Sequence, residues 1–92
     1  MSLNSVKGLN SVKKYLKTLP RDTVTQIALN MINEVLAKIT NFVEPSDLIR
    51  KLEIVQTLLK YQGATDEVQK ITEDVIDNLV SDVKTIFSVK SV

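Results

Sequence analysis

Residues 21–43, RDTVTQIALNMINEVLAKITNFV, decide the fold class of this chain. Apolar side chains recur there at intervals of three and four residues, which is the period of an α-helix and not of a β-strand. Several of them are β-branched and favour strands by propensity, but over a segment of this length the period is the stronger indicator. They form one broad apolar face: Val24, Ile27, Ala28, Met31, Ile32, Val35, Ile39 and Phe42. The stretch therefore predicts a long amphipathic helix.

The same period continues on both sides of this stretch, and prolines and glycines separate the segments. Pro20 suits the first turn of a new helix, because its missing N–H would be unpaired there anyway. The residue before Pro45 is disfavoured in a helix, and Gly63 supplies the left-handed conformation that ends many helices. The sequence predicts helices over residues 5–19, 21–43, 46–62 and 65–89. Because the connections are short, we expect an all-α fold, a small antiparallel bundle of four helices in one domain of residues 1–92.

The composition excludes several classes of function. The 92 residues include no cysteine and no histidine, so disulfides, thiolate metal sites and the commonest general base are absent. We expect no catalytic residue, no cofactor and no metal site, and the chain is not predicted to be an enzyme. Glu73, Asp74 and Asp77 are close in sequence, but without a glycine-bearing loop or a histidine they indicate a solvated acidic face.

No stretch of the sequence is typical of a membrane span or a secretory signal. The longest run without a charge, residues 23–33, has eleven residues and includes Thr, Gln and Asn, whereas a span needs about 20 apolar residues. The first residues carry lysines instead of a continuous apolar segment. We therefore expect a cytoplasmic protein.

The basic residues are concentrated at the amino terminus. The first 21 residues hold five basic side chains and no acidic one, which marks them as candidate phosphate contacts: Lys7, Lys13, Lys14, Lys17 and Arg21. On a continuous helix Lys13, Lys17 and Arg21 follow one another at intervals of four and form a ridge. A solvated face, a contact with the acidic last helix and an anionic membrane surface are the alternatives. Residues 1–20 are either a helix of the bundle or a basic, peripheral arm beside a three-helix core of residues 21–92.

The second predicted helix carries unusually few charges for a surface helix. Its polar residues are mostly uncharged, and Leu29, Leu36 and Val43 form a second apolar line away from the main face. We therefore predict that this helix is covered on more than one side, either by the first helix or by a second copy or another protein. The residues predicted to form a protein interface are Gln26, Leu29, Asn30, Asn33 and Leu36.

Two functions follow as hypotheses. The first is a non-enzymatic helical interaction module that self-associates, for example as a homodimer, and serves as an adaptor or small accessory subunit of a larger assembly. The alternative is a nucleic-acid-associated accessory protein, such as a small subunit of a replication or transcription complex, that contacts phosphates through its basic first helix. A helix-turn-helix motif in the second and third helices is disfavoured, because Glu44, Asp47 and Glu53 lie among the basic residues that would meet DNA.

Overall fold

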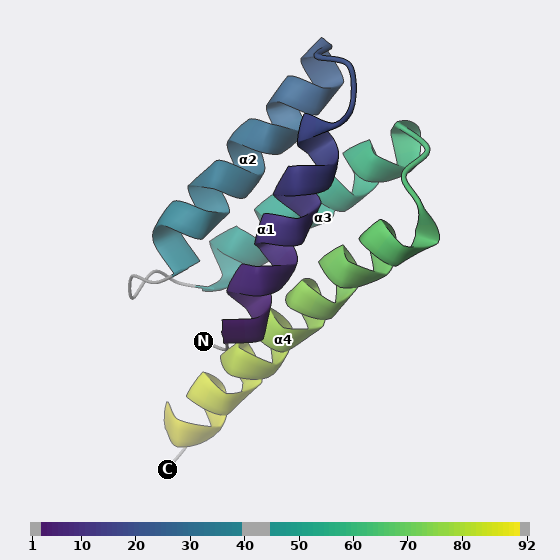
Figure 1. Ribbon diagram of the computed structural model, residues 1–92. Helices are drawn as coiled ribbons and strands as arrows, with labels where there is room; N and C mark the ends of the chain where they lie inside the picture. The colour runs from purple at the N-terminus through teal and green to yellow at the C-terminus, as the bar shows by residue number, and fades with distance from the viewer. Residues whose placement is uncertain (1–2, 40–44, 91–92) are drawn as a thin grey trace.

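The computed structural model describes residues 3–39 and 45–90 (Figure 1). In this part of the chain all regular structure is helical, in four elements: α1 (Leu3–Lys17), α2 (Thr23–Ile39), α3 (Pro45–Tyr61) and α4 (Asp66–Lys90). The prediction of an all-α fold is confirmed, and the observed ends differ from the predicted ones by one or two residues wherever both are described. The predicted end of the second helix, residues 40–43, lies outside the described residues.

The helices form an antiparallel ring in which each packs against its neighbours in the chain and α4 closes onto α1. Figure 1 shows α1 and α2 side by side, with α3 behind α1 and α4 along its other flank. Within the described residues the diagonal pairs α1–α3 and α2–α4 make no close backbone approach. At 25 residues α4 is the longest helix, and its carboxyl-terminal end extends beyond the amino-terminal end of α1.

Local hydrogen bonds fix where the helices begin and end. The carboxylate of Asp22 accepts a hydrogen bond from the Thr25 N–H at 2.8 Å, which is the N-cap arrangement for α2. The pKa of Asp22 lies below its ordinary value because of this bond first and a further one from the Gln62 amide. At the end of α3, Gly63 has φ +71°. The N–H of Ala64 bonds the Leu59 carbonyl at 3.0 Å, which completes a Schellman turn.

The core is one continuous cluster to which all four helices contribute. The stripe of α3 predicted from the sequence is buried in full, since Leu48, Leu52, Val55 and Leu59 have no exposed surface. From α1, three residues join the same cluster with at most 1% of their surface exposed: Leu9, Val12 and Leu16. Helix α1 is therefore an integral part of the bundle and not a peripheral arm.

Gly8 allows α1 to approach α4 closely. A Cβ atom placed on Gly8 would lie 3.0 Å from the Val75 Cγ2 and 3.2 Å from the Ile71 Cγ2, which is closer than carbon atoms pack without strain. Glycine costs about 1 kcal/mol relative to alanine in a helix interior. Its presence here is explained by the short distance between the two helices.

We predict that Gly8→Val destabilises the protein although valine is the better helix former. The added side chain overfills the contact with Val75, so the free energy of unfolding should fall by about 1–3 kcal/mol, as in other overpacked cores. Chemical denaturation measures this change. Asn10→Val, at an exposed position of the same helix, is the control and should cost at most about 0.7 kcal/mol. A Gly8→Val protein more stable than the wild type would contradict the close approach.

Candidate interaction surfaces

The residues predicted to form a protein interface on α2 separate into two groups. Leu29 is 8% exposed and belongs to the core, and Leu36 is half-buried against it. The three amide residues are exposed: Gln26, Asn30 and Asn33. Of the two predicted coverings, the first helix therefore does not cover this amide stripe, and covering by a second copy or another protein stays a prediction. The chain's own helices cover only the line of leucines, because Leu29 and Leu36 lie on the flank of α2 that faces α1.

The outer face of α2 is exposed but almost uncharged. Seven residues make it up, and one of them is ionised: Thr23, Gln26, Ile27, Asn30, Asn33, Glu34 and Ala37. Two of the amides bond each other, since the Gln26 Nε2 donates to the Asn30 Oδ1 at 3.0 Å. A solvent-facing helix surface usually displays more charge than this, so this face is the most unusual exposed helix surface among the described residues.

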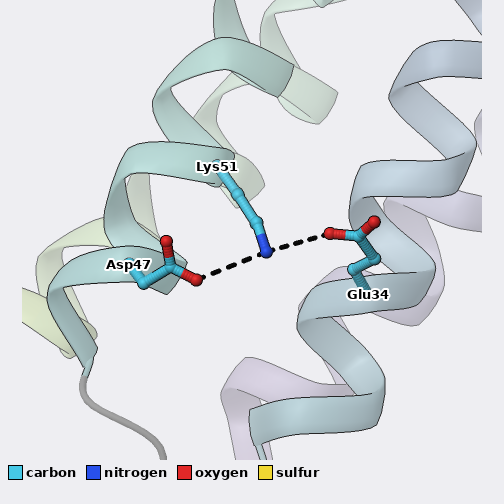
Figure 2. A network of polar contacts seen from close by, with 3 residues as sticks. All are labelled: Glu34, Asp47 and Lys51. Carbon is cyan, nitrogen blue, oxygen red and sulfur yellow. Dashed lines mark ion pairs between the residues drawn. The ribbon is translucent and has the colours of Figure 1, made fainter.

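An ion-pair network joins α2 to α3 at one end of this face (Figure 2). The Lys51 Nζ lies 2.9 Å from the Glu34 carboxylate and 3.3 Å from that of Asp47. The hydrogen bond from Lys51, and then its charge, hold the pKa of Glu34 below its ordinary value, and the charge of Lys38 acts in the same direction. The hydrogen bond to Glu34 in turn raises the pKa of Lys51. These two acids and two bases have no net charge together.

The Glu34–Lys51 contact also fixes the register of α2 against α3. Because the helices are antiparallel, the residues three, seven and ten positions after Lys51 on α3 lie beside the residues three, seven and ten positions before Glu34 on α2. From Lys51 those steps reach Ile54, Leu58 and Tyr61, and from Glu34 they reach Met31, Ile27 and Val24. At the far end, the Gln62 Nε2 donates to the Asp22 carboxylate at 3.1 Å, which agrees with this register.

These positions form an apolar surface, the seam patch, which consists of Val24, Ile27, Met31, Ile54, Leu58 and Tyr61. Ile27 and Ile54 are each 41% exposed and Tyr61 is 79% exposed, and they are the large exposed hydrophobic residues of the described chain. Val24, Met31 and Leu58 are half-buried between them. All three strongly exposed apolar side chains thus gather along one seam instead of being scattered, and contiguous apolar surface of this kind is typical of interaction sites.

The cations of the first helix lie on another side of the bundle. Lys7, Lys14 and Lys17 are exposed on α1, and Lys13 is half-buried. Arg21 is exposed but lies after the end of α1, so the predicted ridge does not continue through it. The helix stops early because Pro20 provides no N–H and the Thr18 hydroxyl bonds the Tyr15 carbonyl at 2.6 Å. Among the described residues, none of these five cations has a carboxylate within ion-pair distance.

The acidic residues of α4 are exposed and lie apart from those lysines. Asp74 and Asp77 border a shallow depression between α1 and α4, together with Asn4, Gly8 and Asn78. No group of three potential metal ligands occurs in the described part of the chain. Although α1 packs on α4, its lysines do not pair with these acids, because the contact is made through Gly8 and the lysines lie on other faces of α1.

Comparison with known proteins adds no further information about function. The chain matches no protein-family model, no curated protein sequence and no solved structure. Within the residues described, none of the helices combines the length and the apolar character that crossing a bilayer requires. The interaction surfaces therefore have to be interpreted from their own chemistry.

We predict that the Lys51→Met substitution raises the pKa of Glu34 toward its ordinary value of 4.5. A carboxylate whose pKa is lowered in the folded state stabilises that state above its unfolded pKa, and the contribution is lost as the pH falls through the folded pKa. The free energy of unfolding of the variant should therefore fall less than that of the wild type as the pH is lowered through the pKa of Glu34. Side-chain NMR titration of Glu34 measures the shift directly. Lys70→Met, on the exposed face of α4, is the control and should leave the titration of Glu34 unchanged.

Proposed function

We propose that this protein is a non-enzymatic helical interaction module that self-associates through the seam patch and acts as an adaptor or small accessory subunit of a larger assembly. One observation carries the proposal. The large exposed hydrophobic residues of the described chain, Ile27, Ile54 and Tyr61, belong to one face. Burying them against another protein removes apolar surface from water, which is the main driving force of association.

The charges of the molecule favour a second copy of the chain as the occupant of this face. In a two-fold symmetric dimer the same patch meets itself, so a patch with net charge repels its own copy. The outer side of α1 is positive, and α4 carries six acidic and three basic residues. The seam patch has no net charge, because the acids at its end are compensated by Lys51 and Lys38. It is the side of the bundle on which the surfaces in contact carry no net charge and so do not repel each other.

The amide residues of α2 extend the proposed interface and can fix the register of the two copies relative to each other. Gln26 and Asn30 lie beside Ile27 on the same outer face, where they can exchange their mutual hydrogen bond for bonds to the other copy. Amide pairs of this kind fix the register of helix–helix contacts. The apolar stripe from Val24 to Met31 is about 10 Å long at about 1.5 Å per residue. An interface of this size belongs to the small, reversible class.

We predict that the wild-type protein dimerises with increasing concentration and that Ile54→Asp shifts the equilibrium to the monomer. Placing a carboxylate in the contact leaves it unpaired on association, so the dimer dissociation constant should rise by roughly tenfold or more. Sedimentation equilibrium measures it. Asn78→Asp adds the same charge at an exposed position of α4, outside the patch; it is the matched control and should dimerise like the wild type.

The salt dependence of association distinguishes a contact through the seam patch from an electrostatic contact between α1 of one copy and α4 of another. If the positive side of α1 binds the negative side of α4 of another copy, salt weakens association, and chains of more than two copies form. Association through the seam patch is not weakened by salt, and it stops at the dimer. A strictly monomeric wild type at high concentration, or an Ile54→Asp protein that dimerises normally, would contradict the proposal.

A further inference from the structure

We infer that the outward side of α1 and the adjoining edge of α2 bind the phosphate backbone of nucleic acid, because α1 carries four lysines and no carboxylate and two amides of α2 lie on the edge nearest to it. This surface, the α1–α2 face, consists of Lys7, Lys13, Lys14, Lys17, Gln26 and Asn33. It adjoins the seam patch, which lies on the side of α2 that packs against α3.

The contacts of the two helices with their other neighbours fix this placement. Gly8 marks the flank of α1 that touches α4, and Lys13 and Lys17 lie roughly 140–180° around the helix from it, toward α2. Lys7 and Lys14 lie roughly 100–120° from Gly8 in the other direction, on the side of α1 that faces away from the core. Glu34 marks the flank of α2 that touches α3. Gln26 and Asn33 lie roughly 80–100° from Glu34, on the side of Leu29 and Leu36. Figure 1 shows α1 and α2 running next to each other over most of their length.

The α1–α2 face is positive because the acids of this half of the chain are elsewhere. Residues 3–39 carry six basic and two acidic side chains, a net charge of +4. Asp22 is held by the Thr25 N–H and by Gln62 of the α3–α4 connection. Glu34 is held by Lys51 on α3. Neither carboxylate neutralises the lysines of α1, so their charge is available to an external anion.

The spacing of the lysines and the hydrogen-bonding groups of the amides on this face suit a row of phosphate groups. Lys7 and Lys17 are ten residues apart, about 15 Å along the helix axis, a length over which one DNA strand carries four or five phosphates. Amide side chains donate hydrogen bonds to phosphate oxygens and position the backbone without reading sequence. Tyr61, the strongly exposed aromatic residue among the described residues, lies on the seam patch. Tyr15 of α1 is half-buried against the core, so the described part of this face offers no fully exposed ring on which bases could stack. Duplex backbone is therefore the expected ligand, with little sequence preference.

An anionic membrane is the other polyanion that such a surface could meet, and the packing of α1 disfavours it. A helix that lies in a membrane interface inserts its apolar face into the lipid. The apolar residues of α1, Leu9, Val12 and Leu16, are buried in the core. Insertion would require α1 to leave the bundle, whereas binding of a phosphate backbone uses the exposed side of the helix as it is.

The test is binding of fluorescent, random-sequence duplex DNA, measured by anisotropy between about 50 and 200 mM salt. The triple variant Lys7→Gln, Lys14→Gln, Lys17→Gln should reduce affinity roughly tenfold or more and lower the slope of log affinity against log salt by about 2.7, since each lost phosphate contact contributes about 0.9. The matched control is Lys60→Gln, Lys70→Gln, Lys84→Gln, which removes the same charge from exposed positions of α3 and α4. It should retain most of the affinity.

A second variant tests the amides independently of the lysines. Asn33→Asp keeps the shape of the side chain and adds one negative charge to the α1–α2 face, so it should weaken DNA binding, whereas Asn78→Asp on α4 should not. Ile54→Asp should bind DNA with the same salt slope per chain as the wild type, which separates this inference from the proposed dimer. Circular dichroism verifies that every variant is folded.

Three results would overturn the inference. The first is no binding of duplex DNA by the wild type at the lowest salt concentration. The second is equal loss of affinity in the two triple variants, which would show that only total charge matters. The third is binding to phosphatidylserine-containing vesicles, lost in the first triple variant, together with no binding to DNA. That outcome would assign the lysines to a membrane surface.

Discussion

The close approach of α1 to α4 at Gly8 is the constraint on which the arrangement of the molecule depends. It closes the ring of helices, so that the apolar stripe of α1 is used inside the core and its lysines are left outside. A side chain at this position would meet Val75 and Ile71, so these side chains would have to shift or the two helices would have to move slightly apart. With α1 in the bundle, Leu9 and Val12 are buried. On a detached α1 they would form the apolar face of a membrane-binding segment. The packing of α1 thus determines which chemistry the helix presents to other molecules.

Closure of the ring also distributes the charges of the chain over different sides. The α1–α2 hairpin is positive, α4 is negative, and the seam between α2 and α3 is neutral because Lys51 compensates the neighbouring carboxylates. A nearly neutral protein with scattered charges would have no preferred side for any ligand. Here the order of the helices around the ring keeps the positive side and the neutral apolar side adjacent, with α2 as their common border.

Much of the fold could be predicted from the sequence, because helix period, capping residues and breakers are local properties. The stripe from Leu48 to Leu59 and the turn at Gly63 are examples. The surfaces were predicted less well. The low charge of the second helix drew attention to its surface, but period alone could not tell that Leu29 is buried while Asn30 is exposed. Ile54 and Tyr61 were not predicted to form an interaction surface, because their proximity to Ile27 depends on the register of α2 against α3.

The shared border on α2 has a consequence for how the two proposed surfaces act together. A dimer formed through the seam patch brings two hairpins, each with a net charge of +4, closer than they are in separate monomers, so their mutual repulsion opposes dimerisation. A bound polyanion neutralises that charge and so removes the repulsion that opposes dimerisation. By linkage the effect is reciprocal: if bound nucleic acid makes dimerisation more favourable by some free energy, dimerisation makes the binding of nucleic acid more favourable by the same amount. Two α1–α2 faces held in one particle also engage a long duplex as a bivalent ligand, which increases affinity without any new contact. The dimer contact and the phosphate contact can therefore each be weak and still give stable binding to a long duplex, because each strengthens the other.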